Sequence, residues 1–133
     1  MENYPTNKGG FTVLAAEAGS IADRTSDGFK NAGAKSLILT VVLANKVGTV
    51  TFTPVVQMKL PNGTWVTIWT AAAALSTAGT YVYELNRDTH ASASGITESK
   101  VVALPHDWRV FLDYTGAGAG NSFDTTVYGE LVV

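Results

Sequence analysis

Apolar and polar residues alternate between residues 50 and 59, and this period of two indicates an extended chain. One face would carry Val50, Phe52, Pro54, Val56 and Met58, while threonine, glutamine and lysine lie mostly on the other. Such alternation is typical of a half-exposed β-strand. Because Pro54 cannot donate a hydrogen bond to a neighbouring strand, we expect this strand to run along an edge or to carry a bulge there.

A tight hairpin is predicted directly after this strand. Its signal is Pro61-Asn62-Gly63, since Asn-Gly accepts the two positive φ values of a type I′ turn. The returning strand, residues 65–70, would place Trp65 and Trp69 on one face. The two rings could form a platform for a sugar, or they could be core or subunit-interface residues. We favour core or interface, where aromatic side chains contribute most.

Residues 37–44 form a continuous apolar run rich in branched side chains, which favours a strand over a helix at this length. Because both faces are apolar, we expect a strand in the middle of a sandwich, covered on each side. Further strands are expected at residues 11–16, 80–85, 101–104, 108–114 and 123–133. The segments between them are interpreted as surface loops at 17–34 and 86–100 and as an alanine-rich connection at 71–78, which could contain a helical turn.

Seven or eight strands with turn residues between them indicate an all-β, antiparallel sandwich. Eight strands in two sheets is the count of a jelly roll, and an immunoglobulin-like sandwich is the alternative. We expect a single domain over residues 11–133, preceded by a flexible arm at residues 1–10. A chain of 133 residues can fold without disulfides, and this one has no cysteine.

Charge is sparse, with 15% charged residues against 46% hydrophobic ones and a net charge of −2. The nine basic residues are spread singly along the chain, without the basic stripe that a nucleic-acid interface requires. The longest apolar runs, residues 37–44 and 71–75, are far shorter than the ~20 residues of a membrane-spanning helix. We therefore expect neither nucleic acid nor membrane as a partner.

Three segments with ligand-like residues give no convincing site. The glycine-rich segment 116–120 precedes an expected strand, whereas a phosphate-binding loop precedes a helix. His90 follows Asp88 at a spacing that is common by chance, and His106 follows a proline at the mouth of a strand. We expect no metal and no cofactor.

The carboxylates offer no catalytic pair. Asp107 and Asp113 lie about 20 Å apart along one strand at ~3.3 Å per residue, beyond the roughly 5–9.5 Å that separates glycosidase carboxylates. The chain also lacks a Gly-x-Ser-x-Gly nucleophile motif. The sequence predicts no catalytic residues and no enzymatic activity.

Four patterns follow one another between residues 34 and 133. They are the apolar strand at 37–44, a Thr/Val strand ending in Gln and Lys at 50–59, an aromatic return strand with an alanine stretch and Gly-Thr-Tyr-Val-Tyr up to residue 83, and Leu-Pro-x-x-Trp-Arg-Val at 104–110. In this combination the chain resembles the head decoration, or capsid cement, proteins of tailed phages.

The resemblance implies a jelly-roll-like protein on the outer capsid surface, often a trimer, with no catalytic residues to carry over. We therefore expect a virion structural protein, assembled in the host cytoplasm, that stabilises the capsid by bridging neighbouring major capsid subunits. Sparse charge also favours a homo-oligomer. The alternative is a carbohydrate-binding or adhesion module on a phage tail or fibre. The candidate subunit or capsid interface residues are Tyr4, Phe11, Trp65, Trp69, Tyr83 and Glu130.

Overall fold

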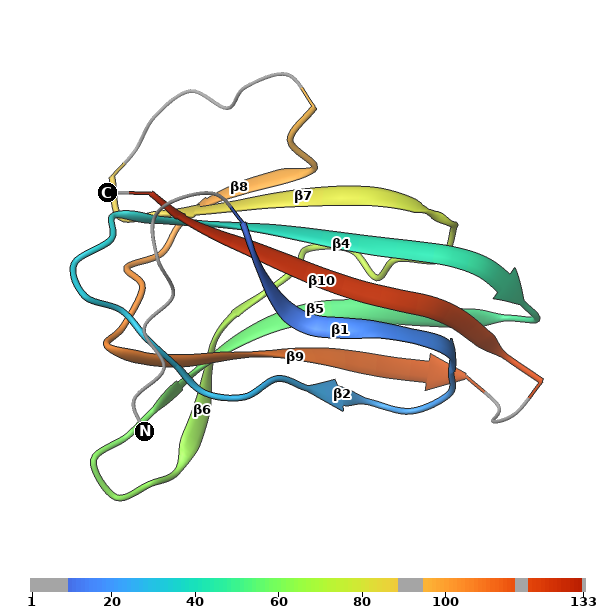
Figure 1. Cartoon of the computed structure of the whole chain (residues 1–133), viewed down its shortest axis with the longest axis horizontal. Coiled ribbons are helices and arrows are strands. Elements are labelled where there is room, and N and C mark those ends of the chain that lie inside the picture. The colour runs from blue at the N-terminus through green and yellow to red at the C-terminus, as the bar shows by residue number, and fades with distance from the viewer. Residues whose placement is uncertain (1–9, 89–94, 117–119, 133) are drawn as a thin grey trace.

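A computed structural model describes residues 10–88, 95–116 and 120–132 of the chain. These residues form ten strands (Figure 1). The strands are β1 (Phe11–Ser20), β2 (Arg24–Thr25), β3 (Phe29–Lys30), β4 (Ser36–Val47), β5 (Val50–Lys59), β6 (Trp65–Thr70), β7 (Gly79–Asn86), β8 (Glu98–Val101), β9 (Asp107–Gly116) and β10 (Ser122–Val132). The described ranges contain no helix, and hence none long and apolar enough to cross a membrane.

The strands form two sheets that pack face to face, which confirms the predicted β-sandwich (Figure 1). Sheet A has the order β1-β10-β4-β7-β8. Sheet B has the order β2-β9-β5-β6, and β3 pairs with β9 as β2 does. All pairs are antiparallel except β7 with β8, which is parallel.

The strand order is that of a jelly roll. If β2 and β3 count as two parts of one strand and β8 is set aside as an addition, the ten strands reduce to eight, ordered 1-8-3-6 in one sheet and 2-7-4-5 in the other. An immunoglobulin sandwich would instead place its first two strands side by side in one sheet. The jelly-roll prediction is therefore preferred to its alternative, and the chain passes between the sheets repeatedly.

The core lies between the sheets and takes alternate residues from the long strands β4, β7, β9 and β10. On β9, Trp108, Val110 and Leu112 are fully buried, because alternate residues of a strand point to the same face. The strand β4 lies in the middle of sheet A, and its residues 37, 39, 41 and 43 face the core. Its opposite face is only half-buried, at Ile38 and Val42 for example. The prediction that this strand is covered on both sides is therefore wrong, because sheet A is an outer layer of the sandwich.

The segments interpreted as loops contain regular structure. The strand β1 continues to Ser20, and β2 and β3 fall inside residues 17–34. In the second segment the strand is at Glu98–Val101, not at residues 101–104. The alanine-rich connection forms no helical turn. Instead, Leu75 bridges to Phe52 of β5.

Pro54 lies in an inner strand, which corrects the expectation of an edge or a bulge at this residue. The strand β5 pairs with β9 on one side, where Pro54 is opposite Leu112, and with β6 on the other. The Phe52 N–H points to the β6 side, where it donates to Leu75, and the carbonyl of Pro54 accepts from Ala71 on that same side. The nitrogen of Pro54, which carries no hydrogen, faces this same side beyond the end of β6. The proline therefore removes no hydrogen bond between strands.

Candidate interaction surface

The hairpin between β5 and β6 positions Trp65. The amide of Gly63 donates to the carbonyl of Leu60 (2.9 Å), and the amide of Leu60 donates to the carbonyl of Thr64 (2.7 Å). Gly63 has φ 89°, whereas Asn62 does not have positive φ. The loop is therefore a type I turn followed by a left-handed glycine, not the predicted type I′ turn. The reason is Pro61, whose fixed φ suits the second position of a type I turn.

A β-bulge at Ile68 separates the two tryptophans of β6. Trp65 is opposite Lys59, but Trp69 is opposite Val56, because Ile68 has no partner in β5. An unpaired residue reverses which face the following side chains occupy. Val56 is in the core and Lys59 is exposed. Trp69 therefore points into the sandwich and Trp65 out of it, so the prediction of a shared face, and with it the two-ring sugar platform, is wrong.

Trp65 is held on the outer face of sheet B by groups from three other segments. The guanidinium carbon of Arg109 on β9 lies 4.4 Å from the centre of the indole, and the ammonium of Lys59 lies 6.0 Å from it. A Cβ atom at Gly28 would lie 3.3 Å from the indole ring, so the ring rests closely against the backbone there. Trp65 is half-buried, and these contacts restrict its ring.

Arg109 is oriented by a neutral partner. Its Nε donates to the side-chain oxygen of Gln57, which lies directly opposite it on β5 (2.8 Å). Partial burial lowers the pKa of Arg109, because the guanidinium has lost some of its hydration. We call Trp65, Arg109, Lys59 and Gln57 the Trp65 cluster.

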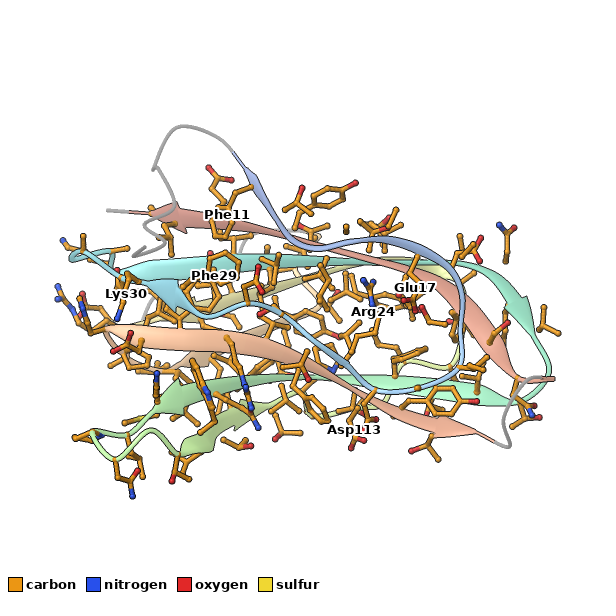
Figure 2. The ribbon with its side chains drawn as sticks, turned by 60° about the horizontal axis from the view of Figure 1, so that its bottom comes forward. Phe11, Glu17, Arg24, Phe29, Lys30 and Asp113 are labelled. Carbon is orange, nitrogen blue, oxygen red and sulfur yellow. The ribbon has the colours of Figure 1, made fainter. Side chains whose placement is uncertain are left out.

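The remaining interface candidates are spread over the molecule. Tyr4 lies outside the described residues. Phe11 is half-buried, and its ring packs against that of Phe29 (Figure 2), with 5.5 Å between the ring centres. The ring centre of Trp108 lies 6.3 Å from that of Phe11. Glu130 is exposed on the outer face of sheet A, near Tyr128, which is 45% exposed.

Trp69 and Tyr83 are core residues, which corrects their selection as interface candidates. They are 5% and 1% exposed, and their rings meet edge to face at 5.3 Å. Burial, and next the charge of Glu98, raise the pKa of Tyr83. Glu98 accepts hydrogen bonds from the indole N–H of Trp69 (3.1 Å) and the amide of Ala72 (2.8 Å). This group therefore joins the β6 and β8 edges of the two sheets.

A pocket of about 170 Å³ opens beside Glu98. Its lining is Ala72, Ala73, Leu75, Tyr83, Thr97 and Glu98. Both oxygens of the Glu98 carboxylate already accept a hydrogen bond, and the buried Tyr83 hydroxyl is not accessible to solvent. The pocket thus offers mostly apolar walls and little free polar chemistry.

The histidines and aspartates considered above as metal ligands or catalytic groups do not come together in the structure. His106 Nδ1 lies 3.1 Å from the carbonyl of Asn31, and His90 lies outside the described residues. Asp107 accepts a hydrogen bond from Lys30, and Asp113 lies further along the same strand, β9. In the part of the chain that the structure describes, no three His, Asp or Glu side chains gather as metal ligands would.

Sequence reasoning found Trp65 but missed Arg109, Lys59, Gln57 and Gly28. The alternation of polar and apolar residues in the sequence of β5 and β9 does place Gln57, Lys59 and Arg109 on the polar faces of these strands. Their meeting at Trp65 depends on the pairing of β9 with β5, between residues far apart in the chain. Local patterns do not contain that information.

No protein-family model and no curated protein matches the chain. Among solved structures, a chain of "Structure of infectious bursal disease virus Gx strain" is similar, with a TM-score of 0.45 and 11% sequence identity. The match covers 92% of this chain and 32% of that one, so the present chain spans about a third of the length of the viral chain. A likeness of this size carries no statement about function, and the assignment of the fold rests on the strand order.

Proposed function

We propose that the chain is a non-enzymatic virion structural protein that decorates the outer surface of a phage capsid and stabilises it by bridging neighbouring major capsid subunits. The sequence resemblance to head decoration proteins supports this proposal. The jelly-roll body supports it as well, because a rigid double sheet can present side chains on two outer faces at fixed positions.

The observation that carries the proposal is the Trp65 cluster. A half-exposed tryptophan is fixed by Arg109 at 4.4 Å and by the backbone at Gly28. Protein interfaces are enriched in tryptophan and arginine, and these residues dominate measured binding energies. A ring that is already fixed loses little conformational entropy on binding. The cluster therefore has the composition and the rigidity of an interface anchor.

The test uses capsids assembled without this protein. Purified protein is added to such heads and the mixture is sedimented, with decorated positions located by electron microscopy. We expect saturable co-sedimentation and a higher temperature of head disruption after binding. Heads that bind no protein and show unchanged heat resistance would reject the decoration role.

A carbohydrate-binding or adhesion module is the competing function, and the same protein can be applied to a glycan array. We expect no saturable binding that depends on Trp65. One ring face of Trp65 is covered by Arg109, and Trp69 is in the core, so these two tryptophans cannot stack on a sugar together. Saturable sugar binding that is lost in Trp65→Ala would favour the competing function.

A further inference from the structure

The two cations of the Trp65 cluster form no close ion pair with a carboxylate among the described residues. The ion pairs there are Arg24 with Glu17, Lys30 with Asp107, and Arg87 with Asp88. Arg109 instead uses a neutral amide and an indole ring, and Lys59 is exposed beside the same ring. The nearby Asp107 is already bonded to Lys30. Lys59 acts on Asp107 only at longer range, and Arg109 forms no ion pair among the described residues, so positive charge is only partly compensated at this end of sheet B, on a chain whose net charge is −2.

The geometry of Arg109 favours one kind of ligand group. Its Nε is used by Gln57, and its planar group lies against Trp65, which leaves the terminal N–H groups for an outside acceptor. A guanidinium fork matches a carboxylate, and such charge-assisted hydrogen bonds are stronger than neutral ones. Gln57 and Trp65 thus hold the fork in a fixed orientation before a partner arrives.

The amount of charge favours a protein partner over other anionic surfaces. Nucleic-acid binding depends on many phosphate contacts, and a membrane surface attracts clusters of several basic residues. Here the cations without an ion pair are Arg109 and Lys59, and both lie over the ring of Trp65. Two charges around one aromatic anchor correspond to a small, specific contact with protein carboxylates.

We propose that Arg109, Lys59 and Trp65 form the docking site for an acidic protein surface, with one partner carboxylate on the terminal nitrogens of Arg109 and another facing Lys59. The proposal rests on the proposed decoration function and names the chemistry of the capsid surface that the protein contacts. Trp65 supplies the apolar centre of the contact, and the two cations select the partner and its orientation.

The first experiment measures binding to undecorated heads for the wild type, Arg109→Gln and Lys59→Gln. The control is Lys100→Gln, which removes the same charge from an exposed position on β8. We expect each of the two cluster variants to weaken binding by roughly 10-fold or more, as loss of an interfacial charge pair does. The control should bind within about twofold of the wild type, and added salt should weaken the wild type more than Arg109→Gln.

Thermal melts establish that the variants are folded, and exposed Lys59 provides a second test if Arg109→Gln is unstable. Cluster variants that bind heads as tightly as the wild type would overturn the docking site while leaving the decoration role intact. If the wild type itself binds no heads, the decoration role is rejected, and a second arm of the experiment tests the acidic-partner site on its own. In that arm, poly-L-glutamate is titrated into ¹⁵N-labelled protein. Shifts of the Trp65 indole and Arg109 Nε signals support the acidic-partner site, and unchanged signals reject it.

Discussion

Arg24 reaches from sheet B to sheet A and donates to both oxygens of Thr125, to the hydroxyl at 3.0 Å and to the carbonyl at 3.3 Å. The same hydroxyl shares a hydrogen bond with Ser20 at 2.7 Å, and Glu17 lies 3.7 Å from Arg24 (Figure 2). This polar group lies where the chain passes from β1 in one sheet to β2 in the other. It fastens a strand of only two residues to the body of the sandwich.

Replacing Arg24 by alanine should therefore destabilise the protein. We expect the free energy of unfolding to fall by about 2 kcal/mol, since hydrogen bonds from a charged donor are lost at a largely buried site. The control is Arg87→Ala, whose side chain is 54% exposed, and we expect a change below about 0.5 kcal/mol there. Urea unfolding measures both, and equal stabilities of the two variants would contradict the role given to Arg24.

Gly129 on β10 should not tolerate a side chain. A Cβ atom there would lie 2.9 Å from the ring of Phe11 and 3.0 Å from Val13. The ring would have to leave its contacts with Phe29 and Trp108, so Gly129→Ala should cost about 1–3 kcal/mol as an overpacked site. Gly10→Ala is the matched control, because its nearest contact would be an ordinary 3.5 Å. Melting temperatures compare the pair, and a neutral Gly129→Ala would show that Phe11 is not fixed.

Acid should weaken the fold through two aspartates. The hydrogen bond from Lys30 lowers the pKa of Asp107, and hydrogen bonds from Asn45 and then from the amide of Gly19 lower the pKa of Asp124. A carboxyl whose pKa is lower in the folded state stabilises the fold above its unfolded pKa, and this contribution disappears as the pH falls through the folded value.

The free energy of unfolding should thus decrease as the pH falls below about 4, the ordinary pKa of an aspartate. In Lys30→Met the main cause of the shift at Asp107 is removed, so the decrease should be smaller. Urea unfolding across a pH series measures the slope. The same slope in Lys30→Met and the wild type would disprove the contribution of this pair.

We expect the purified protein to form a homotrimer. Trp69 and Tyr83 cannot contribute to the contact, so the outer face of sheet A around Tyr128 and Glu130 is the surface to test. Tyr128→Ser should shift the equilibrium towards monomer, because it removes an exposed aromatic side chain from that face. Sedimentation equilibrium at micromolar concentration measures the mass, and a wild-type monomer would refute an intrinsic trimer.

Long strands with clear alternation could be predicted from the sequence. The limits of β5 and β6 agree with the pattern, and the strand expected at residues 108–114 lies within β9. The strands β2 and β3 could not be found, because two residues carry no periodicity and their pairing with β9 joins distant segments. The strand order depends on such distant pairing throughout.

The site was only partly predictable for a related reason. The alternation of Trp65, Thr67 and Trp69 in the sequence is real, but the bulge at Ile68 is set by how β6 meets β5, and nothing local signals it. The sequence therefore indicates the half-exposed aromatic side chain of Trp65 but not its contact with Arg109. Arg109, its actual neighbour, comes from a strand more than forty residues away in the chain.

Because of the bulge at Ile68, the two tryptophans of β6 lie in different environments and differ in their fluorescence. Trp65 is partly in water, whereas Trp69 and Trp108 are enclosed by protein. Indole fluorescence moves to shorter wavelength in an apolar environment, so the red side of the emission reports on Trp65 and the blue side on the core. Occupation of the outer face would change the first signal alone, whereas unfolding would change both. The wild-type chain can thus report docking and folding separately without any attached dye.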